Sequence, residues 1–506
     1  MYINGIMSAA TLESLIAENT ALKFDNTRLS NLLEDVTHQI EWLKRQLFGQ
    51  KSERMVPAHD GQCSLDIEGL TTITPLATTT QTITYSRKNP DANKTPHGRD
   101  EIPAHIPRVT IEIEPDYDAT GMEKVGEKIT EQLEYIPPKF SVNRYVRAVH
   151  ATMKNGERTL ICVDMPPLCI DKGKLGPTVV AQTILSKCQD HIPHYRTAQM
   201  ISRDCDMSLP ESTIRDAFKQ GTFLLDAIVN RLEKIALKSN YLQMDESTIK
   251  VMIQPTQGKS HLGYMVVRHA PLEKIILFDY QKTRNVERGK KLLGNFQGTL
   301  QSDGLNLYPI ICKDLKLTAA GCMDHCRRGF DKALTNDRAR ATQALDLIRP
   351  LYAMEDTARE QSLNAEARLA LRKEKSVSVF QAFIAWCNEN LKTAPKSPIG
   401  KAIIYTLDRK AELGRFLEDG NIEISDIMIE NGIRPLAVGR KNFLFAGSED
   451  GARRLAIGYS IIGTCIKNGL NVRKYLNHVL KELPKRMSKN IDDLLPINWK
   501  DPDDLK

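Results

Sequence analysis

The sequence has 506 residues, of which 41% are hydrophobic and 26% charged, and its formal net charge is +7. This composition is typical of a globular protein and excludes a disordered or collagen-like chain, and the length predicts three or four domains. The mild basic excess is compatible with nucleic acid but does not require it. The ten cysteines include no Cys-x-x-Cys pair, which argues against a disulfide framework or a standard zinc ribbon. Without a signal peptide or an apolar run of about 18 residues, we expect a cytoplasmic protein that has no contact with a membrane.

Residues 8–54 are predicted to form a coiled-coil helix with a basic tail. Leu15, Leu22, Leu29, Val36 and Leu43 recur at every seventh residue. A helix packed on its own domain drifts away from a strict period of 3.5, so this pattern favours a homo-oligomer over intramolecular packing. The basic residues at the end of this segment fit either a solvated helix end or contacts to DNA phosphates, and for the second role we single out Lys44, Arg45, Lys51 and Arg54.

Residues 55–105 are rich in Thr, Pro, Asp and Asn and predict a linker. A small β-rich module is expected over 106–167, with strands at Arg108–Glu114 and Arg144–Met153. Residues 168–236 then predict helices. Two of them, Arg196–Asp204 and Pro210–Phe218, have the spacing of a helix-turn-helix, which indicates a DNA-binding region, although any two short helices give this spacing.

The pattern changes at residue 237, where strand-like runs begin. They cover 241–253, 263–269, 273–279, 298–303 and 317–323, with a helix at 284–293 and a long helix from Arg327 to about Leu351. Antiparallel strands followed by alternating helices and strands predict an α/β core over 237–351. We expect a helical insertion at 352–420, a return to the core at 421–452 and a helical tail at 453–506.

Two carboxylates mark this core. Asp245 lies within the first run and Asp303 ends a later one, and a buried Asp on a strand is costly unless a metal or a partner compensates it. Two such strands side by side would begin a divalent-metal site that requires a third acid. Glu430, Glu423 and Asp426 are candidates for that third position.

Each of these acids also has a plainer interpretation. Asp303 precedes Gly304, and this pair is a common turn signal. Glu430 lies four residues before Arg434, which is the spacing of an ordinary ion pair on a helix. Spacing alone therefore does not decide which acids form a site.

Seven short motifs in a fixed order give this chain a resemblance to transposases of the insertion-sequence-66 family. They are Leu43–Gly49, Met244–Thr248, Gln301–Gly304, Gly321–Arg328, Glu430–Pro435, Gly439–Ser448 and Asp492–Pro496. The resemblance implies an RNase H-like catalytic core with an Asp-Asp-Glu (DDE) triad. By motif position the triad falls on Asp245, Asp303 and Glu430, which would be both the catalytic residues and the metal ligands.

The resemblance further implies a bacterial, cytoplasmic DNA transposase that uses Mg²⁺ or Mn²⁺, with two ions expected. Such an enzyme cleaves at the terminal inverted repeats of its element and transfers the strand into target DNA, in some cases with small companion proteins from the same element. An RNase H-like nuclease or resolvase that cuts without joining is an alternative. A non-catalytic DNA-binding relic is another.

The chain departs from the family in its β-rich module. The family carries a four-cysteine zinc module before the Pro-Pro stop, whereas residues 114–160 contain no cysteine. We therefore expect a zinc-finger relic that keeps its fold through its β core, and no bound zinc. A zinc site at Cys322 and His325 is less favoured, because only Cys326 offers a further soft ligand nearby.

Further DNA contacts are predicted near the triad. Dense positive charge after Glu430 suits a DNA backbone, and Phe443, Leu444 and Phe445 are expected to anchor it in the core. The plainer interpretation is a solvated loop. The predicted contacts are Arg440, Lys441, Asn442, His325, Arg327 and Arg328.

Overall fold

The computed structural model describes Thr110 and residues 139–154, 157–171, 173–253, 258–486 and 491–503, with side chains left out over 152–161. The coiled coil and the linker predicted from the sequence lie outside these residues. Apart from Thr110, the described chain belongs to one compact unit, Lys124–Lys506. Among the residues described, no helix is long and apolar enough to cross a membrane.

A mixed five-stranded sheet forms the centre of this unit, which confirms the predicted α/β core. Its order is β5-β4-β3-β6-β7. The first three strands are antiparallel neighbours, while β6 runs parallel to β3 and β7 parallel to β6. The strands are β3 (Tyr241–Met252), β4 (Ser260–Ala270), β5 (Ile275–Gln281), β6 (Thr299–Ser302) and β7 (Thr318–Ala320).

The register of β3 against β6 determines where the two aspartates lie. Tyr241 pairs with Thr299 and Met244 with Ser302, a constant offset of 58 residues. Continued by one residue, this offset sets Asp245 opposite Asp303. The parallel pairing of two central strands therefore aligns two acids that are far apart in the sequence.

A helix covers the free edge of β5. Helix α14 (Glu449–Lys467) approaches closely, since a Cβ on Gly463 would lie 2.6 Å from Ile276 Cγ2. Ser460 Oγ accepts a hydrogen bond from the Phe278 amide at 2.8 Å, and Thr464 Oγ1 accepts one from the Ile276 amide at 3.2 Å. These hydroxyls satisfy backbone groups that would otherwise be unpaired at a sheet edge.

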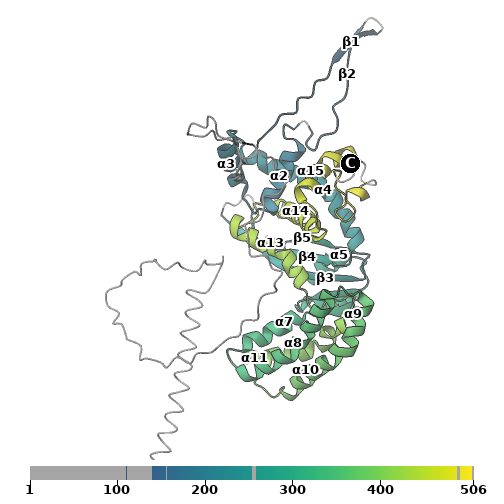
Figure 1. The fold of residues 1–506 in the computed structure, drawn as a ribbon. Coiled ribbons are helices and arrows are strands. Elements are labelled where there is room, and N and C mark those ends of the chain that lie inside the picture. The colour runs from purple at the N-terminus through teal and green to yellow at the C-terminus, as the bar shows by residue number, and fades with distance from the viewer. Residues whose placement is uncertain are drawn as a thin grey trace, which may run out of the picture. The chain divides into compact units, whose positions relative to one another are not determined.

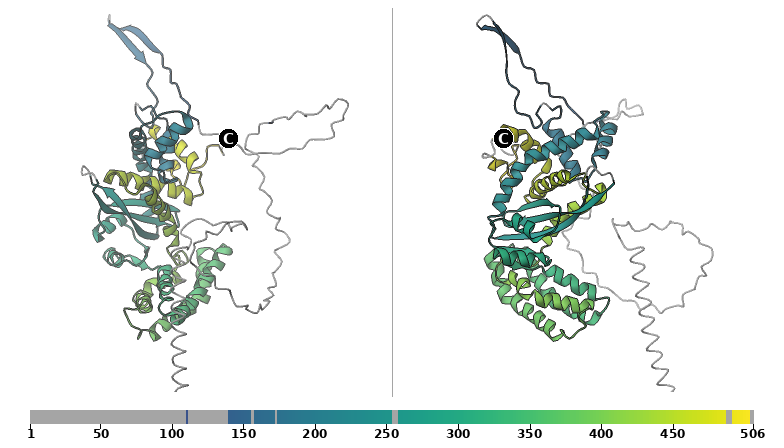
Figure 2. Two further views of the ribbon diagram at one scale, coloured as in Figure 1. Left: turned by 90° about the vertical axis from the view of Figure 1, so that its left-hand side faces the viewer. Right: turned by 180° about the vertical axis from the view of Figure 1, so that it is seen from behind.

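Helices gather at both ends of the described fold, with the sheet between them (Figures 1 and 2). The helices at one end share a hydrophobic core with the sheet and are α2 (Pro177–Cys188), α4 (Glu211–Ala236), α14 and α15 (Val472–Glu482). The predicted helix-turn-helix corresponds to α3 (His194–Cys205) and α4. Because α4 continues to Ala236 and packs on α14, only its start corresponds to a short second helix.

The helices at the other end have a second hydrophobic core, and they begin at Met323, ahead of the insertion predicted over 352–420. They are α7 (Met323–Ala333), α8 (Arg338–Glu360), α9 (Ala365–Leu371), a π-helical turn (Arg372–Ser376), α10 (Val377–Glu389), α11 (Pro398–Asp408) and α12 (Lys410–Leu413). The prediction of one long helix after Arg327 is wrong. The chain turns at 334–337, where the Asp337 side chain accepts a hydrogen bond from the Arg340 amide and starts α8.

The β-rich module is seen only in part. Strands β1 (Val149–Lys154) and β2 (Glu157–Cys162) form an antiparallel hairpin, and β1 begins later than expected. The described side chains here, Val142, Tyr145 and Val146 among them, are exposed, so the expected β core is not found in the described part of the module.

Candidate active site

Asp245, Asp303 and Glu430 come together from three elements of the core. Asp245 lies in β3, Asp303 directly follows β6, and Glu430 lies in the first turn of α13 (Ile427–Phe443). The pKa of Asp245 is raised to about 6, first by burial and then by the negative charges of Asp303 and Glu430, although the Glu246 amide and Arg328 act against this. Asp303 and Glu430 are thus both close enough to Asp245 for their charges to act on it.

A buried polar network brings Glu430 to the sheet. Gln301 on β6 donates hydrogen bonds to the carbonyls of Gly321, at 2.9 Å, and Glu423, at 2.8 Å. The Glu423 amide in turn donates to the Tyr241 hydroxyl at 3.2 Å. The loop that leads into α13 is therefore held against β3 and β6, although Glu423 lies 122 residues after Gln301.

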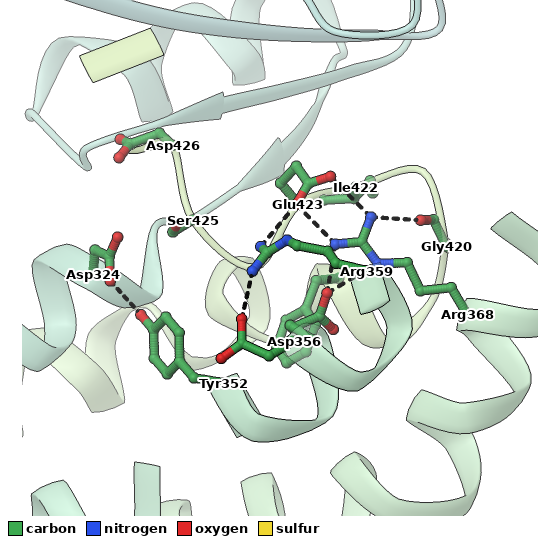
Figure 3. Close-up of polar contacts among 12 residues, drawn as sticks. Asp324, Tyr352, Asp356, Arg359, Arg368, Gly420, Ile422, Glu423, Ser425 and Asp426 are labelled. Atoms are coloured by element: carbon green, nitrogen blue, oxygen red, sulfur yellow. Dashed lines mark hydrogen bonds and ion pairs between the residues drawn. The ribbon is translucent and has the colours of Figure 1, made fainter. Parts of the chain in front are cut away.

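The same loop is fixed from the insertion side. Arg368 on α9 donates to both carboxylate oxygens of Glu423, each at 2.8 Å, and to the Gly420 carbonyl, while Arg359 lies 3.6 Å from Glu423 (Figure 3). Glu423 is thus engaged in structural ion pairs and does not belong with the three clustered acids. Of the alternatives for the third acid, this geometry disfavours Glu423.

Two residues of α7 face Glu430. Arg328 forms an ion pair with the Glu430 carboxylate, and His325 Nε2 lies 3.9 Å from Glu430 Oε1. The pKa of His325 is lowered, mainly by burial and next by Arg328. From the sequence, Arg328 and His325 are expected to support the wall of the active site or to contact phosphate, but nothing in the chain marks their pairing with Glu430 across about a hundred residues.

Asp303 is held by its own turn. Its Oδ1 accepts a hydrogen bond from the Leu305 amide at 3.0 Å, and its carbonyl accepts one from the Tyr405 hydroxyl at 3.0 Å. Gly304 has φ +83°, and a Cβ there would lie 2.9 Å from the Arg409 guanidinium. Only glycine fits this position without strain. Beside the turn lies an open pocket of about 420 Å³, lined by Pro309, Lys401, Ile404, Tyr405, Asp408, Arg409 and Glu412.

Two further acids are closer to the site than the sequence suggests. Once the family motifs assign the triad to Asp245, Asp303 and Glu430, its neighbours Glu246 and Asp426 are expected to lie off the site. Instead, the pKa of Asp426 is raised to about 7 by burial, with Glu430, Asp245 and Asp303 adding to it. The pKa of Glu246 is likewise raised to about 7, mainly by burial, against the Arg284 guanidinium at 2.5 Å. Both Asp426 and Glu246 therefore interact electrostatically with the central acids.

The positive motif after Glu430 is not a loop. Residues 440–442 form the last turn of α13, with Lys441 and Asn442 exposed. Arg440 donates to the Thr248 carbonyl and, at 3.0 Å, to the Thr248 hydroxyl, so it connects α13 to β3. Phe443 is buried, but Leu444 is 63% and Phe445 44% exposed, so the expected anchor of three residues is wrong for two of them.

The remaining predicted DNA contacts are less informative. Arg327 is half exposed and lies 3.8 Å from Asp324, whose side chain also accepts a hydrogen bond from the Tyr352 hydroxyl (Figure 3). The four basic residues expected after the coiled coil lie outside the described part of the chain, and they are Lys44, Arg45, Lys51 and Arg54.

The donor set of the three central acids fits hard divalent cations. Carboxylate oxygens are the ligands that Mg²⁺ and Mn²⁺ prefer. The pKa of Asp245 is raised mainly by burial and further by the charges of Asp303 and Glu430, with Arg328 as an opposing cation. Such an arrangement would be stabilised by positive charge between the acids.

An α/β core that carries three acids is typical of metal-dependent enzymes. Comparisons with known proteins identify the family of this chain. The model described as "Transposase IS66 family" matches residues 172–454. Models described as "Transposase C of IS166 homeodomain" and "IS66 C-terminal element" match 35–111 and 460–497. The chain belongs to the IS66 family of transposases.

Relatives from Sinorhizobium fredii match over nearly the full length. Uncharacterized protein y4qI is 28% identical, over 97% of this chain and 94% of its own length. Uncharacterized protein y4jD is 25% identical, over 94% of this chain and 96% of its own length. Both are similar in overall organisation, and neither name states an activity.

Proposed function

We propose that this chain is a DDE transposase that cleaves DNA at the ends of its element and transfers the freed 3′-hydroxyl into target DNA. The observation that supports the proposal most is that the charges of Asp303, at the end of β6, and Glu430, on α13, both act on Asp245 of β3. The sheet order supports an RNase H-like core, because three antiparallel strands are followed by two strands parallel to the first.

We assign Asp245, Asp303 and Glu430 as ligands of Mg²⁺ or Mn²⁺, with Asp245 between the other two. When bound, a pair of such ions stabilises the attacking and leaving oxygens of an in-line phosphoryl transfer. The protein contributes position: β3 and β6 hold the two aspartates side by side, and the Gln301 network holds the start of α13. Arg328 offsets the charge of Glu430 and orients its carboxylate.

DNA is the proposed partner, both at the element ends that are cleaved and at the target that receives the strand. Lys441 and Asn442 are exposed at the end of α13, and Lys401 and Arg409 line the open pocket beside Asp303. Cations at these positions would contact phosphates and position the strand without reading its sequence. The N-terminal heptads support a homo-oligomer, which would hold two element ends together, and companion proteins remain part of the proposal. We also propose that the β1–β2 hairpin is what remains of the family's zinc module.

The test uses the full chain and a DNA segment bracketed by the inverted repeats that flank its reading frame. With Mg²⁺ present, we expect new 3′-hydroxyl ends at the repeats and, after longer incubation, joined products with a target plasmid. Cut ends that never join would support a nuclease or resolvase instead. Binding to the repeats with no cut ends, in Mg²⁺ and in Mn²⁺, would support a non-catalytic relic.

A further inference from the structure

A second group of potential ligands lies next to the carboxylate site. Cys322 follows β7, His325 lies in the first turn of α7, and Asp426 directly precedes α13. Cys322 Sγ donates to Asp426 Oδ1 at 2.9 Å, and His325 Nδ1 lies 3.7 Å from Asp426 Oδ2. One ligand atom from each of the three residues lies within 4.8 Å of the others.

Two buried atoms of this group, Asp426 Oδ2 and His325 Nδ1, lack hydrogen-bond partners among the described residues. The Asp426 side chain is 0% exposed, yet no described residue donates a hydrogen bond to its Oδ2. His325 Nδ1 is also buried without a hydrogen-bond partner in the described part of the chain. A buried carboxylate is costly unless it is paired or binds a cation. Arg328, the nearby guanidinium, forms its ion pair with Glu430 and not with Asp426.

We infer that Cys322, His325 and Asp426 form a binding site for one zinc-class divalent cation, separate from the Mg²⁺ site. One sulfur, one imidazole nitrogen and one carboxylate oxygen suit Zn²⁺, whereas Mg²⁺ requires oxygen ligands. Zinc bond lengths of about 2.0–2.3 Å place tetrahedral ligand atoms roughly 3.5 Å apart, so small side-chain movements close this cluster around an ion. Binding releases the Cys322 thiol proton, because the thiolate is the ligand.

A cation bound at this site would also affect Glu430, because His325 lies between the two. Its Nδ1 faces Asp426, while Nε2 lies 3.9 Å from Glu430 Oε1. An ion on Nδ1 fixes the tautomer with a proton on Nε2, which then points at Glu430. The ion would also connect the start of α7 to the start of α13, the two segments that carry Arg328 and Glu430.

This proposal departs from the expectation of a zinc-free chain. In the sequence, Cys326 is the only soft ligand near Cys322 and His325. In the structure, Cys326 points elsewhere, with Sγ 3.1 Å from Thr406 Oγ1, and Asp426 takes the third position from 104 residues away. Cys326 is therefore a matched control on the same helix.

The test is metal content of the full-length chain, loaded with Zn²⁺ and desalted. We expect about one zinc per chain in the wild type and in Cys326→Ser, and at least a tenfold loss in Cys322→Ser and Asp426→Asn. Asp245→Asn should keep its zinc, which separates this site from the carboxylate site. Circular dichroism would verify that each variant is folded.

A second readout needs no variant. Co²⁺ bound to the wild-type chain should show a thiolate-to-cobalt charge-transfer band in the near ultraviolet, which marks a Cys ligand. A wild-type chain that binds no zinc, a cobalt complex without that band, or equal losses in Cys326→Ser and Cys322→Ser would each overturn the site. None of these results bears on DNA cleavage, so this proposal can fail while the proposed function stands.

Discussion

Gln301 donates a hydrogen bond to the Glu423 carbonyl, 122 residues further along the chain, at 2.8 Å. The same side-chain amide donates to Gly321 and accepts from Tyr241 and Gln243, so its hydrogen-bonding capacity is used fully inside the core. One glutamine on β6 thus fixes the loop that leads to Glu430. The insertion between them can be long because its two ends are held at this point.

Replacing Gln301 should therefore affect the site more than its distance from the metal ligands suggests. Gln301→Met keeps the length of the side chain but leaves two buried carbonyls unpaired, at a cost of about 1–3 kcal/mol for each unsatisfied group. We expect a lower urea midpoint and a loss of cleavage at temperatures where the variant is still folded. Gln220→Met on the exposed face of α4 is the control and should change neither property.

The buried ion pair of the insertion should be essential for its stability. Arg372 is 0% exposed, donates to both oxygens of Glu355 at 2.7 and 2.8 Å, and also donates to the Phe416, Asp419 and Ile422 carbonyls. Arg372→Met leaves the buried Glu355 carboxylate with Arg368 as its remaining cation and leaves three carbonyls without this donor, and we expect a loss of about 3–5 kcal/mol in urea unfolding.

The control for this prediction is a surface pair of the same helix bundle. Arg349 lies 2.6 Å from Asp346, but both side chains are mostly exposed. Arg349→Met should cost no more than about 1 kcal/mol. Equal losses for the two variants would show that the burial of Arg372 has no energetic importance.

Stability should fall in mild acid because of His269. Its side chain is buried, its Nδ1 lies 2.9 Å from Gln243 Oε1, and its pKa is lowered to about 3, mainly by burial and also by Lys467. Between the ordinary pKa of 6.5 and pH 3, the unfolded chain binds a proton that the folded chain excludes. The free energy of unfolding therefore decreases as the pH falls through this window.

The measurement is the urea midpoint as a function of pH, for wild type and His269→Asn. The variant should have a lower urea midpoint than the wild type at pH 7, but its midpoint should decrease less between pH 7 and pH 5. If the two curves stay parallel, His269 is not the group responsible. His150, exposed on the β1–β2 hairpin, offers a control substitution that should leave the curve unchanged.

The strands and the two aspartates could be predicted because their signals are local. Apolar, β-branched runs bounded by glycine and polar residues predicted the five strands of the sheet, and the positions of Asp245 and Asp303 followed from them. The break before α8 was missed, although Asp337 is a typical N-cap, because the helical periodicity continues on both sides of it.

Contacts across the insertion could not be predicted in the same way. The pairing of Arg328 with Glu430 and of Cys322 with Asp426 joins residues about a hundred positions apart. Nothing in the local sequence encodes such a contact, which depends on how the helical insertion folds back on the sheet. The exposure of Leu444 and Phe445 could not be predicted either, since hydrophobicity alone does not show which residues after a helix end face solvent.

The heptad of residues 8–54 leads to a prediction about oligomeric state. Five apolar residues at strict sevens should bury a seam between chains, so removing residues 1–50 should lower the mass in solution while the α/β core stays folded. Light scattering of both proteins at equal concentration measures this. An unchanged oligomer after the truncation would mean that another surface holds the chains together.

The last prediction concerns the three acids. Asp245→Asn, Asp303→Asn and Glu430→Gln each keep the shape of the side chain but remove one negative charge from a site proposed to hold two divalent cations. Cleavage and strand transfer should both fall at least about a hundredfold, because metal binding and transition-state charge stabilisation are lost together. DNA binding should persist, since removing a carboxylate reduces repulsion of the phosphate backbone.

Asp314→Asn is the control, because this acid of α6 (Leu307–Leu315) pairs with Lys290 on the surface of the same core. It should cleave at the wild-type rate. Asp426 and Glu246 are unsuitable controls, since burial raises the pKa of both and each lies within the electrostatic influence of the central acids. An Asp303→Asn protein that still cuts element ends at the normal rate would remove Asp303 from the site. Mn²⁺ binding followed by electron paramagnetic resonance should weaken in the same three variants and not in Asp314→Asn, which connects the loss of activity to the loss of metal.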